Sequence, residues 1–591
     1  MSKGFVGRVA AISTDIELLD QKIQRQEEEV RQLKTQRNTL ALISMLPPEI
    51  LSQAFLYCIT FDDKRYCGAY RWPWIQISHV CSHWRNVALG CPALWSCLEF
   101  SCPAWVPEML QRSKMAPLSV KVTAEDFFNT KVKDAIETTL QQVSRVSDLM
   151  LCMPGGEKSM AELLVTGMRQ AAPLLRSLSL STSISAWTRG PVTLPLEFVD
   201  GDAPRLKHLE LRNFHLPWDS ALLKNLTSLK IFHTSTGSAP SLQQLTDVLA
   251  RMPGLEILEL KDVLPICKST TPVDTVPLPH LHRIKLDGDT VSVALLLDHI
   301  SFPSTTQMHF VCVVGNIDSN ALIDKASALL SPLSKIRSRL SEPSSSHSQH
   351  KPSTLNITST YAELHIVAGR CCDGSSAPNS APPWLDLTMK GTIAVSTKKG
   401  ELAAKILEAL SPLTSIRHLT LNAPHNFFAV KTFAKVISSL NQVHVFHAEG
   451  PCVSDVFKGL QLLRKGMDRV LIFPSLKVLT LTSVDFDPNR EEEYEVVDQL
   501  QTVLMSRYEA KAEIRSLTLK TCSRLSSHDV QQLRDICVSV RWDGIEDFED
   551  EDEDEEDMFD YDDMMDDSDD DDLMYFGGPV SFPAQWWYPG L

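Results

Sequence analysis

The side chains that could carry out chemistry are scattered histidines, scattered cysteines and one long run of acids. The sequence contains no Gly-x-Ser-x-Gly, no Gly-x-x-x-x-Gly-Lys-Ser/Thr and no His-Glu-x-x-His motif. We therefore expect no catalytic, cofactor-binding or metal-binding residues, and a chain that is not itself an enzyme. Six histidines lie among the hydrophobic segments without an acid or cysteine at ligand spacing: His208, His215, His282, His418, His444 and His447.

The 14 cysteines give no disulfide or zinc pattern. Cys371 and Cys372 are adjacent, and no Cys-x-x-Cys pair has a matching second pair. Reduced thiols in a cytosolic or nuclear protein are the expected state.

The first ten residues are neither a signal peptide nor a myristoylation site, and no apolar run approaches the ~18–20 residues of a membrane span. We expect a soluble intracellular protein of the cytoplasm, the nucleus or both.

The net charge of −17 belongs to one segment. Residues 543–572 contain 21 acids and no Lys or Arg, so the rest of the chain has a net charge of +4 and no global basic field for nucleic acid. We predict that 543–591 is a disordered acidic tail. A solvating role, calcium or histone binding, and nucleic-acid mimicry remain open for it. Its Trp586-Trp587 pair is either a linear binding motif or a segment that folds back.

Two N-terminal elements precede the main body. Residues 43–98 predict a compact helical unit, because prolines and an acid at Pro47-Pro48-Glu49 favour a helix start and apolar residues follow at helical spacing. So much apolar surface on a short segment indicates a docking surface. Residues 12–42 predict a helix that either forms a short coiled coil or packs one stripe on its own domain. Gln26 and Arg37 interrupt its near-heptad seam of Ile12, Ile16, Leu19, Ile23, Val30, Leu33 and Leu40.

The pattern apolar-x-x-apolar-x-apolar recurs through residues 115–542. Its first six copies start 29, 31, 20, 29 and 26 residues apart. Alternation at the end of each copy predicts a strand, and helix-like stretches such as 242–252 and 496–508 lie between copies. The copies begin at Val146, Leu175, Leu206, Leu226, Leu255, Leu281, Ile416, Leu440, Leu476 and Ile514, several after a proline (Pro173, Pro204, Pro253, Pro279 and Pro474).

A strand plus a helix every ~20–29 residues is typical of leucine-rich repeats, in which stacking buries the apolar faces. The repeats are irregular, because Phe214 and Val484 stand where an asparagine is expected. Flexible insertions are predicted near 331–353 and 371–383, with strands but no recognisable repeat around them. An ordinary α/β domain is the alternative. Polar residues of the copies are expected to point outward as a partner-binding face: Lys207, Glu210, Glu256, Glu259, His282, Lys285, Arg417, Thr420, Arg515 and Thr518.

Residues 46–98 resemble an F-box. Leu46-Pro47-Pro48-Glu49-Ile50-Leu51 matches its opening, Phe55-Leu56 its apolar pair, and Val80-Cys81-Ser82-His83-Trp84-Arg85 its closing motif. Cys91-Pro92-Ala93-Leu94-Trp95-Ser96 is similar to the version common in mushroom-forming fungi. In those proteins a heptad-like helix often precedes the F-box and irregular leucine-rich repeats follow it. An insert from Cys58 to Trp74 replaces the short turn of a typical F-box.

The resemblance implies an α/β protein with an N-terminal helix, a helical F-box, an irregular leucine-rich-repeat-like solenoid and a disordered acidic tail. It also implies docking on the Skp-type adaptor of a cullin–RING (SCF) ubiquitin ligase. The solenoid would bind a protein substrate for ubiquitin-dependent degradation, with no cofactor, membrane or nucleic-acid partner. The implied adaptor contacts are Leu46, Pro47, Pro48, Ile50, Leu51, Phe55, Val80, Cys81 and Trp84.

Two alternatives to the ligase function remain open. One is a repeat-based scaffold that lacks ligase function, for which the insert after Cys58 is the support. The other is a histone- or nucleic-acid-associated chaperone that acts through the acidic tail. Deletion of residues 543–591 should leave adaptor binding intact under the ligase function, whereas loss of all partner binding would favour the chaperone.

Overall fold

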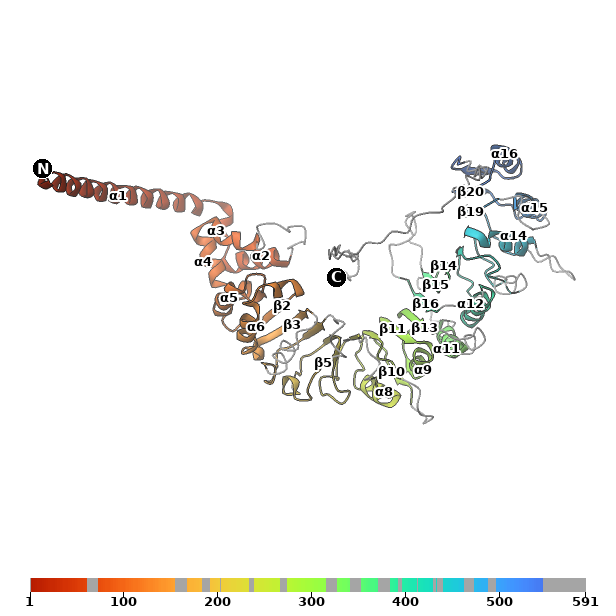
Figure 1. Ribbon diagram of the computed structural model, residues 1–591, viewed down its shortest axis with the longest axis horizontal. Coiled ribbons are helices and arrows are strands. Elements are labelled where there is room, and N and C mark those ends of the chain that lie inside the picture. Colours follow the sequence, from red (N-terminus) through yellow and green to blue (C-terminus); the bar gives the residue numbers. More distant parts are fainter. Residues whose placement is uncertain are drawn as a thin grey trace, which may run out of the picture. The chain divides into compact units, whose positions relative to one another are not determined.

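A computed structural model of the chain shows a mixed α/β protein (Figure 1). Two units are distinguished, 1–547 and 548–591. The second lies outside the described residues, as does the predicted acidic tail from 546 onward. The structure describes residues 2–60, 73–154, 167–182, 192–201, 203–232, 239–265, 274–314, 327–340, 352–369, 383–391, 396–411, 413–428, 432, 439–461, 472–486 and 496–545.

Helices form the N-terminal part, as predicted. The long helix α1 (Ser2–Thr39) leads through a 3₁₀ turn, η1 (Leu42–Met45), into α2 (Pro48–Thr60). Pro48 is the first residue of α2, where a missing N–H costs nothing and the fixed φ suits the helix. The insert predicted from Cys58 continues α2 as far as Thr60, and residues 61–72 lie outside the described part. The unit is completed by η2 (Pro73–Gln76), α3 (Ile77–Val80), α4 (Ser82–Gly90) and η3 (Pro92–Trp95).

Prolines start several of the repeated strand units. In each of these units the proline is the second residue of a turn, and the carbonyl before it accepts a hydrogen bond of 3.0 to 3.2 Å from the N–H two residues after it. Proline favours this position because its φ is already set. The leucine that closes the turn is at most 3% exposed and leads into the strand. The prolines are Pro173, Pro204, Pro253, Pro279 and Pro474.

In the described part of the chain, seventeen strands form one large sheet, in which every neighbouring pair is parallel except the two pairs made by β15. Two further parallel pairs lie apart from it, β5 (Val192–Thr193) with β7 (Phe214–His215) and β10 (Val276–Pro277) with β12 (Ile300–Ser301). The order across the large sheet is β1 (Cys97–Glu99), β2 (Leu118–Val122), β3 (Val146–Met153), β4 (Ser177–Thr182), β6 (His208–Arg212), β8 (Ser228–Phe232), β9 (Ile257–Lys261), β11 (Arg283–Asp289), β13 (Gln307–Val313), β16 (Leu385–Lys390), β15 (Glu363–Gly369), β14 (Thr354–Ser359), β17 (His418–Asn422), β18 (Val445–Glu449), β19 (Val478–Thr482), β20 (Ser516–Lys520) and β21 (Ser539–Trp542).

Nine of the ten predicted pattern copies coincide with strands of this sheet. The copy placed at Leu440 is out of register by three residues, because β18 begins at Val445 and its buried positions are Phe446 and Ala448. The pattern misled there because Val443 and Val445 alternate just as the correct pair does. Strands β1, β2, β13 and β21 lie outside the predicted copies.

The sheet order reverses between β13 and β17. The chain crosses from β13 to β14 beside β17, and β15 and β16 then fill the gap backwards, so that β16 pairs with β13. The antiparallel strand β15 is what joins the two parallel parts. This reversal explains why the repeat pattern disappears there. The predicted insertion 331–353 differs in its first part, which is helix α11 (Leu330–Leu340); residues 341–351 and 371–382 lie outside the described residues.

Buried apolar residues replace the expected asparagines at the strand ends. Phe214 and Val484 are at most 3% exposed and pack into the core that runs from Leu51 to Cys537. A left-handed residue precedes each of them, Asn213 with φ 60° and Ser483 with φ 51°. The N–H of that residue donates to a carbonyl of the next strand, over 2.8 Å for Asn213 and 3.0 Å for Ser483. Backbone bonds thus connect each of these units to the next, and the side-chain amide of Asn213 donates to the Thr182 carbonyl of the preceding strand.

The longer helices lie along one side of the strands, as Figure 1 shows for α9, α11, α12, α14 and α15. The other side carries the partly exposed residues that alternate with the core leucines, and we call it the open face. Side-chain caps start some of these helices, such as Asp289, which accepts from the N–H of Val291 over 3.0 Å. The helices are α5 (Val106–Arg112), α6 (Val132–Leu140), α8 (Leu242–Ala250), α9 (Thr290–Asp298), α11, α12 (Ser396–Leu410), α14 (Val453–Gln461), α15 (Val496–Glu509) and α16 (Ser527–Ile536).

Candidate functional site

The candidate adaptor contacts divide into a surface group and a core group. Leu46, Ile50 and Val80 are 38%, 52% and 58% exposed, and Pro47 and Pro48 beside them are also exposed. They lie at the end of η1, in the first turn of α2 and at the end of α3. Apolar side chains left in water at helix ends are available to a partner.

Leu51 and Phe55 lie beneath this surface, with only 1% and 2% of their area exposed. The Phe55 and Trp84 rings pack with centroids 5.1 Å apart at an angle of 52°. The half-buried Cys81 caps α4, since its Sγ accepts from the N–H of Trp84 over 3.4 Å. The contact between Phe55 and Trp84 therefore joins α2 to α4, and Cys81 holds the first turn of α4. In this conformation Leu51 and Phe55 position the surface group and do not themselves reach a partner.

Further exposed apolar residues adjoin the surface group, and the sequence prediction did not include them. They come from the turn between α1 and α2 and from α2 itself. Their signal was a run of apolar residues at the boundary between the predicted helix 12–42 and the predicted unit 43–98, and none of them was included among the contacts. The residues, with their exposed fractions, are Leu42 (84%), Ile43 (48%), Met45 (73%) and Tyr57 (64%).

The open face of the sheet carries charges of alternating sign along one row. Cross-strand register places Glu210, Lys230, Glu259, Lys285 and His309 side by side on neighbouring strands. The Lys230 Nζ lies 3.7 Å from a Glu259 carboxylate oxygen. In the adjacent row the corresponding ion pair joins Lys261 and Asp287 at 3.2 Å, and the Arg212 guanidinium lies 3.9 Å from the Phe232 ring centroid. Opposite charges on facing strands stabilise the sheet and give this face a defined pattern.

The ten residues predicted to point outward fall into two groups. Glu210, Glu259, Lys285, Thr420 and Thr518 lie within strands on the open face. The other members precede their strands by one residue and continue the backbone ladder, as in the bond from the N–H of Glu256 to the carbonyl of Thr227 (2.8 Å). The prediction paired two positions three residues apart, whereas a strand repeats every two. The group outside the strands is Lys207, Glu256, His282, Arg417 and Arg515.

Three side chains missed by the sequence analysis meet on the open face at the reversal. Asp386 on β16 accepts from His309 Nδ1 on β13 and from His365 Nε2 on β15, both at 2.8 Å. The hydrogen bond to Asp386 raises the pKa of His365, against the effect of burial. Burial alone would raise the Asp386 pKa, but the two imidazoles outweigh it and hold that pKa well below its usual range. No sequence signal was available, since the histidines lie 77 and 21 residues from their acid.

Replacing Asp386 with Asn is expected to lower the pKa of His365, because a neutral amide replaces the carboxylate. In the wild type, the raised pKa of His365 stabilises the folded state. This stabilisation is full below about pH 6.5, the pKa in the unfolded chain, and is lost as the pH rises through the pKa of His365 in the folded state. Titration of ¹³C-labelled histidine, with His365→Gln for assignment, measures the shift. The control Asp287→Asn removes a carboxylate that pairs with Lys261 and should leave the His365 pKa unchanged. An unaltered His365 pKa in Asp386→Asn would contradict the geometry.

The six histidines considered in the sequence do not form such a cluster. His447 on β18 bonds Thr482 Oγ1 at 2.9 Å, and burial lowers its pKa; burial also lowers the pKa of His418 and His215. Within the described part of the chain, no group of three or more His, Cys, Asp or Glu residues is arranged to hold a metal ion.

The described cysteines are all present as thiols. None of the ten described cysteines forms a disulfide, and Cys371 and Cys372 lie outside the described residues. Burial raises the pKa of the Cys312 and Cys452 thiols to about 12, so both stay protonated.

None of the helices in the described ranges has both the length and the apolar character needed to cross a bilayer. In comparisons with known proteins, no family model and no curated protein matches the chain.

Proposed function

We propose that this chain is the substrate-recognition subunit of an SCF-type ubiquitin ligase. Residues 43–98 are an F-box-like unit that docks on the Skp-type adaptor, and the sheet is an irregular leucine-rich-repeat-like solenoid that binds the protein substrate. The observation that carries the proposal is that some motif residues are buried and others are exposed. Leu51 and Phe55 are buried and Trp84 packs against Phe55, while Leu46 and Ile50 remain exposed above them.

In this role the chain would act by holding the substrate close to the subunits that transfer ubiquitin. A few apolar anchors on helices fill pockets of a helical partner and supply most of the affinity. The open face, with its ordered charges, would hold the substrate, and ubiquitin transfer would be the chemistry of other subunits. No cofactor is required by this role. Turns with proline at their second position and strands linked by backbone bonds support the repeat assignment.

The double variant Ile50→Asp/Val80→Asp is expected to abolish adaptor binding. Both side chains are more than half exposed, so the variant should fold while losing two anchors worth about 2 kcal/mol each, or roughly a 1,000-fold weaker Kd. Titration calorimetry with the full chain and a purified Skp-type adaptor measures this. The control Met115→Asp/Met505→Asp adds the same charges at residues that are 84% and 48% exposed, and should bind like the wild type.

The same titration separates the alternatives. A wild-type chain that does not bind the adaptor, or a double variant that binds as well as the control, removes the ligase proposal in favour of a scaffold without ligase function. A chain truncated after Ile545 should keep full adaptor affinity. Loss of binding on that truncation would favour a chaperone that acts through the acidic tail.

A further inference from the structure

The first helix carries an apolar stripe that the rest of the described chain leaves in water. Ile16, Leu19, Ile23, Val30 and Leu33 are 53%, 57%, 52%, 49% and 64% exposed. The alternative that this stripe packs on its own domain is therefore not what the structure shows. Their spacing is a heptad with Ile16, Ile23 and Val30 at position a and Leu19 and Leu33 at position d. Branched residues at a with leucine at d favour parallel two-stranded coiled coils.

From this stripe we propose that α1 binds the α1 of a second copy of this chain as a parallel, in-register coiled coil. The charged residues beside the stripe favour the α1 helix of a second copy as the partner. In such a dimer Lys22 faces Glu27 of the second copy, and Glu29 faces Lys34 of the second copy, so four opposite-charge pairs form by symmetry. The unfavourable contacts are Asp15 opposite Asp20, which occurs twice, and Arg37 at position a, which faces its own copy at the end of the helix. An antiparallel pair over the same residues brings Lys22 to Glu29 but also Asp20 to Glu27, which cancels the gain.

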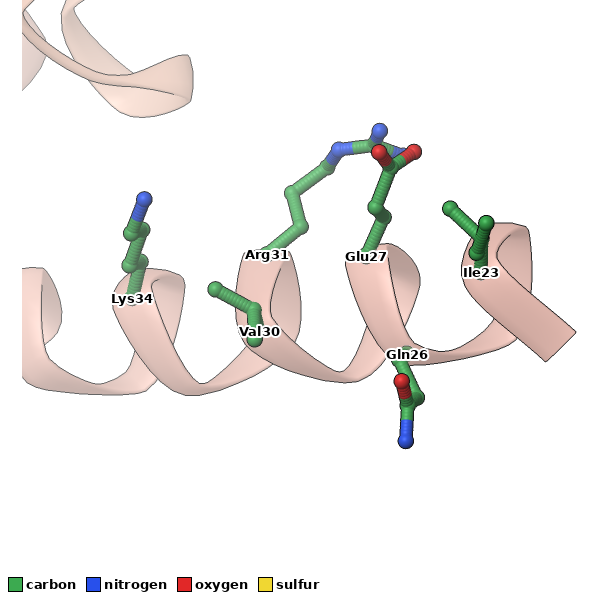
Figure 2. Close-up of a pocket in the computed structure, with 6 residues that line it drawn as sticks. All are labelled: Ile23, Gln26, Glu27, Val30, Arg31 and Lys34. Atoms are coloured by element: carbon green, nitrogen blue, oxygen red, sulfur yellow. The ribbon is translucent and has the colours of Figure 1, made fainter.

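The surface of α1 also contains a hollow that could receive a side chain of a facing helix. A hollow on the helix is lined by Ile23, Gln26, Glu27, Val30, Arg31 and Lys34. Figure 2 shows Ile23, Glu27, Arg31 and Lys34 extending toward one side of α1 with Val30 between them. Ile23, Gln26, Glu27 and Val30 occupy positions a, d, e and a, the set of four that receives a d side chain of the facing helix.

Gln26 fixes the register of the pair. At position d it meets Gln26 of the second copy only when the two helices are in register, and there the two amides can bond each other. A shift of one heptad would place each amide against leucine, which leaves a polar group unpaired in an apolar seam. The inference is independent of adaptor binding, because α1 precedes the F-box-like segment and shares none of its proposed contacts.

Light scattering on the full chain tests the proposal. The wild type should have twice its mass of 66.0 kDa, and Ile23→Glu/Val30→Glu should have the single-chain mass. The control Leu18→Glu/Gln32→Glu adds equal charge on the opposite face, where Leu18 is 55% exposed, and should remain dimeric. A monomeric wild type, a dimeric Ile23→Glu/Val30→Glu or a monomeric control would each overturn it. A wild type that associates only with a helix of another protein would overturn it too.

Orientation and register have separate readouts. Oxidised Val30→Cys should yield a disulfide between the two Cys-containing α1 peptides, identified by mass spectrometry; a dimer without it would refute the parallel register. Lys22→Glu/Lys34→Glu and Glu27→Lys/Glu29→Lys should each be monomeric alone, because every facing pair becomes repulsive. Their mixture should restore the dimer mass, and a mixture that stays monomeric would refute the charge assignment.

Discussion

Replacing Arg507 with alanine is expected to reduce the local stability of the C-terminal strands by about 3 kcal/mol. Arg507 on α15 is fully buried, and its guanidinium donates to the carbonyls of Ile472 (2.9 Å) and Phe473 (2.6 Å). Burial lowers its pKa to about 10, so it still carries its charge at neutral pH. Phe473 keeps a second donor, the N–H of Leu476, at 3.0 Å. Alanine would therefore remove a donor from each carbonyl and leave a cavity beside α15.

Two further variants separate the loss of the hydrogen-bond donors from the effect of the cavity. Arg507→Met fills the space without donating and should cost about 1–2 kcal/mol, whereas Arg507→Lys keeps a charge that can reach one carbonyl. A chain of this length does not unfold in one step, so hydrogen exchange of 472–486 and of α15 is the appropriate measurement. The exposed Arg534→Ala is the matched control, with an expected change within about 0.5 kcal/mol. Equal exchange in Arg507→Ala and the control would show that the guanidinium does not hold this segment.

The strand positions were largely predictable from the sequence, for a local reason. A proline at the second position of a turn, a leucine two residues later and alternation after it are all encoded within about ten residues. The copy at Leu440 failed because Val443 and Val445 mimic that alternation. The pairing with β17 shows the correct frame, in which the N–H groups of His444 and Val445 both donate to the Arg417 carbonyl, over 2.8 and 3.1 Å.

Features that depend on distant segments could not be predicted. The reversed order of β14, β15 and β16 follows from which strand edges are free when the chain reaches them, and a local pattern does not contain that information. The cluster of His309, His365 and Asp386 is a direct consequence of the reversal, because parallel strands in chain order would not bring those residues together. Arg507 likewise finds its carbonyl partners 34 and 35 residues away.

The position of the N-terminal motif was predictable from the sequence, but which of its residues are buried and which are exposed was not. Helical spacing identified Leu51 and Phe55 together with Ile50, since all three lie on the same short helix. Which of them faces the core depends on where α4 packs, and the ring contact between Phe55 and Trp84 decides it. A motif match alone therefore assigns partner contacts to residues that this fold uses internally.

Replacing Gly400 with alanine is expected to destabilise the middle of the sheet by about 2–3 kcal/mol. A Cβ at this position of α12 would lie 1.7 Å from the Phe427 carbonyl oxygen and 2.7 Å from its carbon, both backbone atoms. On another side of the helix, Lys399 Nζ donates to the carbonyls of Thr360 (2.5 Å) and Tyr361 (2.7 Å). A shift of α12 away from Phe427 would also strain the Lys399 bonds. The usual gain of about 1 kcal/mol for alanine over glycine in a helix does not offset this.

The matched control for Gly400→Ala is Gly90→Ala. Gly90 also lies in a helix, α4, and a Cβ there would meet nothing within 4 Å. Since helix propensity alone acts at that site, we expect Gly90→Ala to be neutral or stabilising by up to about 1 kcal/mol. Opposite signs for the same substitution, measured by hydrogen exchange of α4, α12 and residues 413–428, would attribute the loss to the contact with Phe427. If both variants behaved alike, α12 would have room to move, and the close approach at Gly400 would not restrain it.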